Sequence, residues 1–167
     1  MIVLIDGFSV AFRAFYALPD SLTTSDGTPT NVIHGFLSMI NKVIKDHEPE
    51  KLIITWDLPG KTFRNEIYKE YKANRTPAPD NFNIQIPLLH DLIDSFNIPQ
   101  ISKKNHEADD VLGSLSKLFN EIKKDVLIVT GDRDIFQLIS KKTKILYTKK
   151  GISDTDTMDE KSFEKKI

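Results

Sequence analysis

The chain has 167 residues, a usual length for one domain, and its 40% hydrophobic and 28% charged residues suit a protein with a packed core. Its net charge of −1 excludes binding of nucleic acid by overall charge, so such binding must rest on local patches. The chain has no cysteine, signal peptide or long apolar stretch, which excludes disulfides, zinc-thiolate sites and membrane spans. We therefore expect a soluble, cytoplasmic protein with no membrane partner.

Short apolar runs rich in β-branched residues alternate with amphipathic helical patterns along the chain. The predicted strands, in chain order, are 2–5, 52–56, 98–102, 126–130 and 144–147. The predicted helices are 32–44, 84–96, 111–122 and a short segment after Asp132. Apolar strands that alternate with helices predict an α/β fold, in which helices cover both faces of a parallel central sheet.

A polar and basic stretch, 61–79, interrupts this pattern and predicts an exposed insertion. Between Lys61 and Arg75 the local net charge is +3, and aromatic residues are interleaved with the basic ones. Basic residues contact phosphates and aromatic faces stack on unpaired bases, so the stretch suits nucleic acid. A solvated loop whose aromatic residues pack back on the core is an equally good interpretation. From Gly151 onward the chain is charged and shows no strong apolar stripe.

Acidic residues directly follow three of the predicted strands. Asp6 follows the first, Asp57 the second, and Asp132 with Asp134 the strand at 126–130. Ligands bind at the carboxyl ends of the strands in an open parallel sheet, so we expect these acids to share one edge. Each of them taken alone also suits a turn. Arg13, shortly after Asp6, is expected either to hold a substrate phosphate or to pair with one of the acids.

Three more acids, Glu107, Asp109 and Asp110, precede the clearest helical pattern. Taken alone they also suit a capped helix N-terminus. Together with the strand-end acids, up to seven carboxylates would meet at one edge and repel each other unless a cation neutralised them. Oxygen ligands without cysteine suit Mg²⁺ or Mn²⁺, and such a site suits phosphoryl chemistry.

Five segments form an ordered set of motifs: LIDGFSVAFRAFYAL, LTTSDGTPTNVIHGF, WDLPGKTFRNEIYKEYKANRTPAP, HEADDVLGSL and VTGDRDIFQLI. Together they resemble the 5′-nuclease domain at the N-terminus of bacterial DNA polymerase I. That family also includes 5′-3′ exonucleases and flap endonucleases, within the PIN-like fold group. The resemblance runs from Met1 to about Phe163. It implies a PIN-like 5′-nuclease domain over 1–167, with 61–79 as an arch-like insertion.

The resemblance implies metal-dependent hydrolysis of DNA, and often of RNA, near 5′ ends and flaps. It implies two Mg²⁺ or Mn²⁺ ions in the complete family fold, and a DNA polymerase, fused or separate, as a partner. The residues that it implies for the first metal site are Asp6, Asp57, Glu107, Asp109, Asp110 and Asp132. Asp134 matches the link to the second metal site. The implied catalytic and DNA-binding residues are Lys72, Arg75 and Arg13, joined by Arg64 and Tyr71 for DNA binding alone.

In the family pattern, a Gly-Asp-x-x-Asp-Asn motif and a helix-hairpin-helix region follow the last of these motifs, and this sequence contains neither. The acidic motif completes the second metal site, and the helix-hairpin-helix region grips duplex DNA. We therefore expect a truncated domain that binds one metal ion well and cleaves DNA weakly or not at all, because two-metal chemistry needs both ions.

Two other functions stay open at this stage. A PIN-domain ribonuclease has a similar length and a similar carboxylate site, although the basic and aromatic insertion argues against it. A non-catalytic module that binds DNA or a partner is the second alternative. A dinucleotide-binding protein is disfavoured, because Asp6 is followed by GFSVAF and not by a G-x-G-x-x-G turn.

Overall fold

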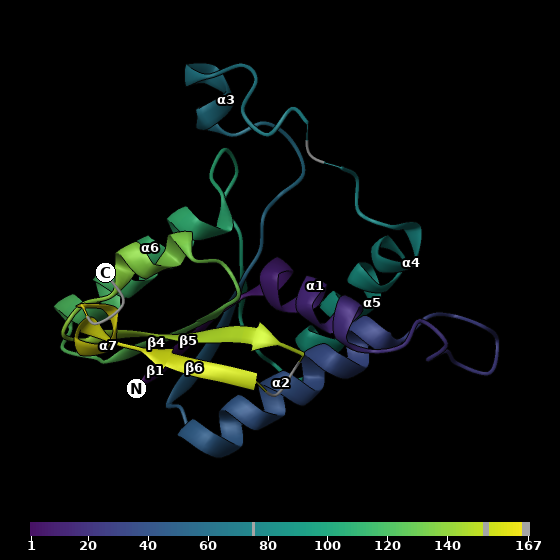
Figure 1. Ribbon diagram of the computed structural model, residues 1–167, viewed down its shortest axis with the longest axis horizontal. Coiled ribbons are helices and arrows are strands. Elements are labelled where there is room, and N and C mark those ends of the chain that lie inside the picture. Colours follow the sequence, from purple (N-terminus) through teal and green to yellow (C-terminus); the bar gives the residue numbers. More distant parts are fainter. Residues whose placement is uncertain (75, 152–153, 165–167) are drawn as a thin grey trace.

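The computed structural model describes residues 1–74, 76–151 and 154–164 and has a six-stranded sheet at its centre, in the order β3-β2-β1-β4-β5-β6 (Figure 1). The strands are β1 (Ile2–Asp6), β2 (Lys51–Thr55), β3 (Gln100–Ile101), β4 (Val126–Thr130), β5 (Thr143–Lys150) and β6 (Asp154–Met158). The first five are parallel, and β6 pairs antiparallel with β5. The predicted parallel sheet is thus confirmed except at this edge.

Helices cover both faces of the sheet, as predicted. They are α1 (Gly7–Ala17), α2 (Asn31–His47), α3 (Phe63–Ile67), α4 (Asp80–Asn83), α5 (Gln85–Ser95), α6 (Ala108–Glu121), the 3₁₀ helix η1 (Asp134–Leu138) and α7 (Glu160–Glu164). All five residues of β1 are buried, and successive side chains point to opposite faces. Val3 and Ile5 join the core beneath α1, α2 and α5, whereas Ile2 and Leu4 join the core beneath α6 and η1.

Helix α1 and strand β6 are two of the elements that were not predicted from the sequence. Helix α1 begins directly after β1, and it buries Val10, Ala11 and Ala14 on one side only. Strand β6 lies in the charged segment after Gly151, and only its last residue, Met158, is buried. β6 carries a weak local pattern because it is a mostly exposed edge strand, whereas α1 was missed although its apolar residues fall at helical spacing.

The described residues of the insertion, 61–74 and 76–79, extend away from the sheet, with α3 at the far end (Figure 1). None of the residues of α3 is buried, and Ile67 and Tyr68 are 81% and 59% exposed. The alternative in which its aromatic residues pack back on the core is wrong for Tyr68. The arch-like role of the segment stays a prediction.

The order of the strands creates a crevice at the carboxyl ends of β1 and β4. The chain runs from β1 to β2 and β3 on one side, and then crosses to β4 on the other side of β1. The connections that follow β1 and β4 therefore run in opposite directions and leave a crevice between them. Ligands bind at such a topological switch point in open α/β sheets. Within the described ranges, no helix has both the length and the hydrophobicity needed to cross a membrane.

Candidate active site

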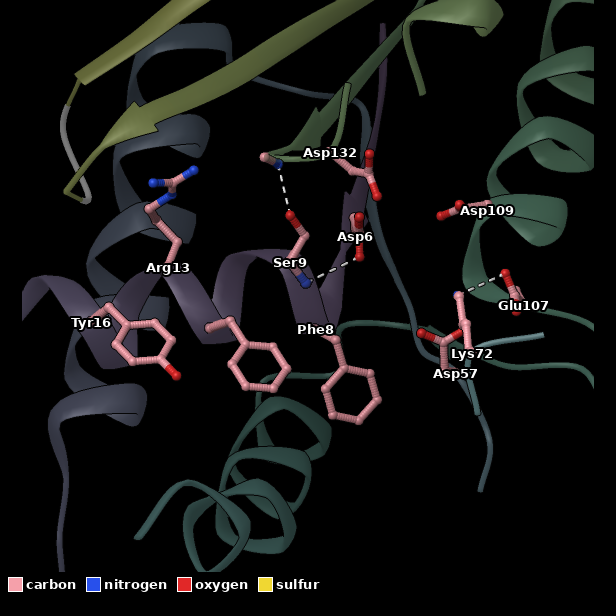
Figure 2. A pocket seen from close by; sticks show the side chains of 12 residues that line it. Asp6, Phe8, Ser9, Arg13, Tyr16, Asp57, Lys72, Glu107, Asp109 and Asp132 are labelled. Atoms are coloured by element: carbon pink, nitrogen blue, oxygen red, sulfur yellow. Dashed lines mark hydrogen bonds and ion pairs between the residues drawn. The ribbon is translucent and has the colours of Figure 1, made fainter. Parts of the chain in front are cut away.

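A pocket of about 490 Å³ lies at this crevice, and acidic side chains from four parts of the chain point into it (Figure 2). The first lies at the end of β1, the second after β2, two at the start of α6, and the last after β4. These carboxylates are Asp6, Asp57, Glu107, Asp109 and Asp132. The structure therefore brings together five of the seven predicted acids.

Asp6 is the buried acid at the base of the pocket. It is the N-cap of α1, and its side chain accepts hydrogen bonds from the backbone N–H of Ser9 (3.2 Å) and the hydroxyl of Thr130 (2.7 Å). Burial raises the pKa of Asp6 to about 6, although both hydrogen bonds oppose this rise. The charges of Asp57 and Asp132 raise the pKa further.

Asp109 points across the pocket from the first turn of α6 (Figure 2). Its pKa is raised to about 7, first by burial and then by the charges of Asp6, Asp132, Asp57 and Glu107. Apart from Glu107, these acids are far apart from Asp109 in the sequence, so most of this repulsion exists only in the folded protein. The pocket is therefore a place where positive charge is strongly favoured.

Asp57 and Asp132 are both held by backbone N–H groups. Asp57 accepts from the N–H of Ala108 (2.8 Å), which ties the end of β2 to the N-terminus of α6. Asp132 accepts from the N–H of Asp134 (2.9 Å), and its own N–H donates to the Thr130 hydroxyl (3.0 Å). These contacts fix where each carboxylate enters the pocket.

Glu107 is buried at the edge of the pocket, where it meets the insertion. Its carboxylate accepts from the Lys72 ammonium (3.1 Å) and from the Tyr71 hydroxyl (3.3 Å). The carboxylate of Asp110 accepts from the N–H of Glu107 (2.9 Å), as in a capped helix N-terminus. Arg64 holds the same Asp110 carboxylate and lowers its pKa below the usual range.

Two of the predicted metal ligands lie outside this pocket. Asp110 and Asp134 line a neighbouring groove between α6 and η1. In the described part of the chain, no three acidic or histidine side chains surround one point closely enough, as they stand, to hold a metal ion. The donor set still fits a hard divalent cation, because its oxygens repel one another across a single pocket.

The basic residues differ in how close they lie to the acids. Lys72 lines the pocket and pairs with Glu107. Arg13 also lines the pocket, but its guanidinium donates to the carbonyls of Thr148 (2.9 Å) and Lys149 (2.7 Å) at the end of β5. The alternative in which Arg13 pairs with an acid is therefore wrong. Arg75 lies outside the described residues.

Helix α1 contributes residues that the sequence analysis did not select. Phe8, Phe12 and Tyr16 are spaced four residues apart, and all three line the pocket; Figure 2 labels Phe8 and Tyr16. This spacing places them on one helix face. The apolar residues after Asp6 already show a helical pattern in the sequence, and that pattern could have predicted this face. Ser9 was missed as well, and its hydroxyl accepts from the N–H of Gly131 (2.7 Å), so it joins α1 to the turn after β4.

The sequence matches, over residues 1–167, the family described as 5′-3′ exonuclease, N-terminal resolvase-like domain. The chain belongs to this family. It is 44% identical over 162 residues to DNA polymerase I of Caldicellulosiruptor bescii, a match that covers 95% of this chain and 19% of that protein. It is 36% identical to DNA polymerase I of Bacillus subtilis, with 93% of this chain and 18% of that protein covered. The chain thus spans about a fifth of the length of these curated relatives.

Solved structures of 5′-nucleases share the fold of this family member. The T5 5′-exonuclease with bound zinc superposes with a TM-score of 0.72 at 19% identity, covering 98% of this chain and 59% of that one. The catalytic core of Rad2 in complex with a DNA substrate gives a TM-score of 0.57 at 18% identity, covering 98% of this chain and 49% of that one. These similarities confirm the predicted PIN-like α/β fold.

Proposed function

We propose that this domain is the metal-binding half of a DNA 5′-nuclease, which hydrolyses DNA phosphodiesters near 5′ ends and flaps with the help of divalent cations. The observation that carries this proposal is the meeting of five carboxylates in one pocket at the switch point of the sheet. The similarity to the N-terminal part of bacterial DNA polymerases I supports the same activity and supports a fused or separate polymerase as a partner. A T5 flap endonuclease that was crystallised with DNA and metal ions supports the substrate and the cofactor.

Asp6, Asp57, Asp109 and Asp132 are the proposed anchors of a Mg²⁺ or Mn²⁺ ion. Rotation of the more exposed side chains toward the buried Asp6 would close the site. Glu107 would order water around the ion. Asp134 lines the neighbouring groove, where we place the second ion, whereas the Asp110 carboxylate in that groove is already held by Arg64. A bound divalent cation supplies positive charge that activates a water molecule and offsets charge on a phosphate.

The basic residues at the edge of the pocket are the proposed partners of the phosphate. Lys72 already lies at the edge of the pocket, so its ammonium can turn from Glu107 to a phosphate oxygen and stabilise the charge that develops there. We propose that Arg75 and Tyr71, from the same insertion, also contact DNA. Arg13 can do so only if it releases its two carbonyl partners.

The aromatic side of α1 gives the pocket a second wall. Phe12 stacks on the buried Phe82 with ring centroids 4.0 Å apart, so its ring is fixed from behind. Tyr16 is 74% exposed at the far end of the same row. Aromatic faces bind unpaired bases whatever the sequence, so this wall suits a nucleotide next to the cleaved bond.

The test is cleavage of a 5′-flap DNA by the purified chain in excess over substrate, so that slow turnover is detected. We expect product only with Mg²⁺ or Mn²⁺, and none from Asp132→Ala. Lys72→Ala should slow cleavage by about 10²-fold, as expected for loss of a group that stabilises transition-state charge, while calorimetric titration shows metal binding largely unchanged. Equal cleavage by Asp132→Ala would contradict the metal assignment.

A matched single-stranded RNA separates this activity from that of a PIN-domain ribonuclease. The proposal predicts that the flap DNA is cleaved faster, because the insertion and the aromatic wall of α1 suit an unpaired strand that leads into a duplex. Faster cleavage of the RNA strand would favour the ribonuclease. An RNA strand placed at the 5′ end of an RNA–DNA hybrid tests whether RNA is accepted in the same position.

A further inference from the structure

The insertion is fastened to the first turn of α6 by one forked ion pair. The two terminal nitrogens of Arg64 donate to the two carboxylate oxygens of Asp110, at 2.7 and 2.8 Å. The pair is partly shielded from solvent, since the side chains of Arg64 and Asp110 are 28% and 22% exposed. A forked pair with this geometry fixes orientation as well as distance, because both groups are planar.

The same turn of α6 also holds the middle of the insertion, at Tyr71 and Lys72. The Asp110 carboxylate accepts from the N–H of Glu107, and the Glu107 carboxylate accepts from Tyr71 and Lys72. Inside the insertion, the side chain of Asn65 donates to the carbonyl of Tyr71 (3.0 Å). Arg64 and Lys72 thus contact neighbouring positions of one helical turn, and the residues next to them, Asn65 and Tyr71, are hydrogen-bonded to each other.

We infer that Arg64 is a positioning residue, whose fork with Asp110 fixes the base of the insertion on α6 and so places Lys72 at the edge of the acidic pocket. This inference rests on the proposed function, in which Lys72 serves a phosphate bound in that pocket. It replaces a direct DNA contact as the role of Arg64. A guanidinium whose two terminal nitrogens are already bound by a carboxylate must release that carboxylate before it can bind a phosphate in the same way.

Hydrogen exchange of the insertion tests the fork without any assay of activity. Arg64→Ala and Asp110→Asn should each speed exchange in peptides covering 61–74 on the order of tenfold, and the double variant should add little to either. Arg64→Lys should behave like Arg64→Ala, because an ammonium cannot form the fork. Lys69→Ala, an exposed position in the same insertion, is the control and should leave exchange unchanged. Unchanged exchange in Arg64→Ala would overturn the inference.

Binding of a 5′-flap DNA at several salt concentrations, without divalent cations, tests the alternative of a direct contact. If Arg64 contacts a phosphate, Arg64→Ala should lower the dependence of binding affinity on salt concentration by about one contact, that is, a slope smaller by about 1. The same decrease should appear in the Asp110→Asn background, and Arg64→Lys should keep the slope of the unaltered chain. A positioning residue instead lowers the slope only through Lys72, so Arg64→Ala leaves the slope of a Lys72→Ala variant unchanged and adds no loss to Asp110→Asn. If the unaltered chain does not bind the flap, the proposed function fails, whereas the exchange experiment still decides the role of Arg64.

Discussion

Asp109 is the residue that most clearly marks the pocket as a cation site. Its pKa of about 7 lies well above the ordinary value of 3.8, because burial and four neighbouring carboxylates disfavour its charged form. Between about pH 4 and pH 7, the folded protein therefore keeps a proton on Asp109 that the unfolded chain has already released. Without a cation, Asp109 contributes most to stability at low pH, and this contribution is lost as the pH rises to about 7. Asp6 acts in the same direction, with a pKa of about 6.

Asp109→Asn should stabilise the domain when no divalent cation is present, because it removes one charge from the repelling cluster. At pH 8 we expect a gain on the order of 1 kcal/mol, which is kept small because Asp109 is partly exposed and its charge is screened by water. The gain should be smaller at pH 5, where the carboxyl of the unaltered protein is already protonated. Urea unfolding at both pH values measures it, with Asp91→Asn, an exposed acid on α5, as the control. An equal effect at the two pH values would contradict the assigned cause.

Added Mg²⁺ should raise the melting temperature more at pH 8 than at pH 5.5. Protons and cations compete for the same carboxylates, and Asp6 and Asp109 are largely protonated at the lower pH. At a hundredfold excess over the dissociation constant, a single site would add about 2.7 kcal/mol of stability. Thermal melts with and without MgCl₂ at the two pH values make the measurement. A shift that is larger at pH 5.5 would argue for binding elsewhere.

At the scale of elements, the junction between β1 and α1 holds the site together. Gly7 opens α1, and a Cβ atom at this position would overlap the ring of Trp56, the residue before Asp57. The close contact between β1, α1 and the end of β2 therefore requires glycine. The turn after β4 is similarly tight, since a Cβ on Gly131 would lie 2.9 Å from the Thr148 hydroxyl and 3.0 Å from the Arg13 guanidinium.

Gly7→Ala should destabilise the domain by about 1–3 kcal/mol, the usual cost of forcing an extra carbon into a packed interior. Gly113→Ala is the matched control, because its added carbon would meet Leu138 at an ordinary 3.4 Å in the middle of α6. That change should be neutral or stabilising by roughly 0.5–1 kcal/mol, since alanine favours a helix more than glycine. Chemical unfolding of the two variants makes the comparison, and a similar loss in both would show that the Trp56 contact is not the cause.

The central strands were predictable because each is an apolar run that must be buried on both faces. β4 was predicted at its observed bounds, and β1 and β2 to within a residue at each end. β6 was missed because an edge strand needs no apolar pattern when its partner strand supplies the hydrogen bonds. Helices α3, α4 and α7 are only four or five residues long, so they carry little local signal and depend on contacts with the rest of the fold.

At the scale of the whole molecule, sequence position predicted five acids that meet in the pocket, wrongly added Asp110 and Asp134 to them, and did not predict how any of them is held. Asp6, Asp57 and Asp132 follow parallel strands, so the sheet itself brings them to one edge. The pairing of Arg64 with Asp110 joins residues 46 positions apart, and nothing in the local sequence specifies it. The same holds for Arg13, whose carbonyl partners on β5 are more than 130 positions away.

The most direct test of the shared pocket is substoichiometric Mn²⁺ added to the isotope-labelled chain and followed by NMR, because this paramagnetic ion broadens signals from nuclei close to it. The account predicts that the amide signals of Ser9, Ala108, Gly131 and Asp132 broaden first, while that of Met158 in β6 stays sharp. Asp109→Asn should weaken this effect. Broadening that begins at Asp154 or Glu160, or that is spread evenly over the surface, would contradict the claim that these acids share one cation.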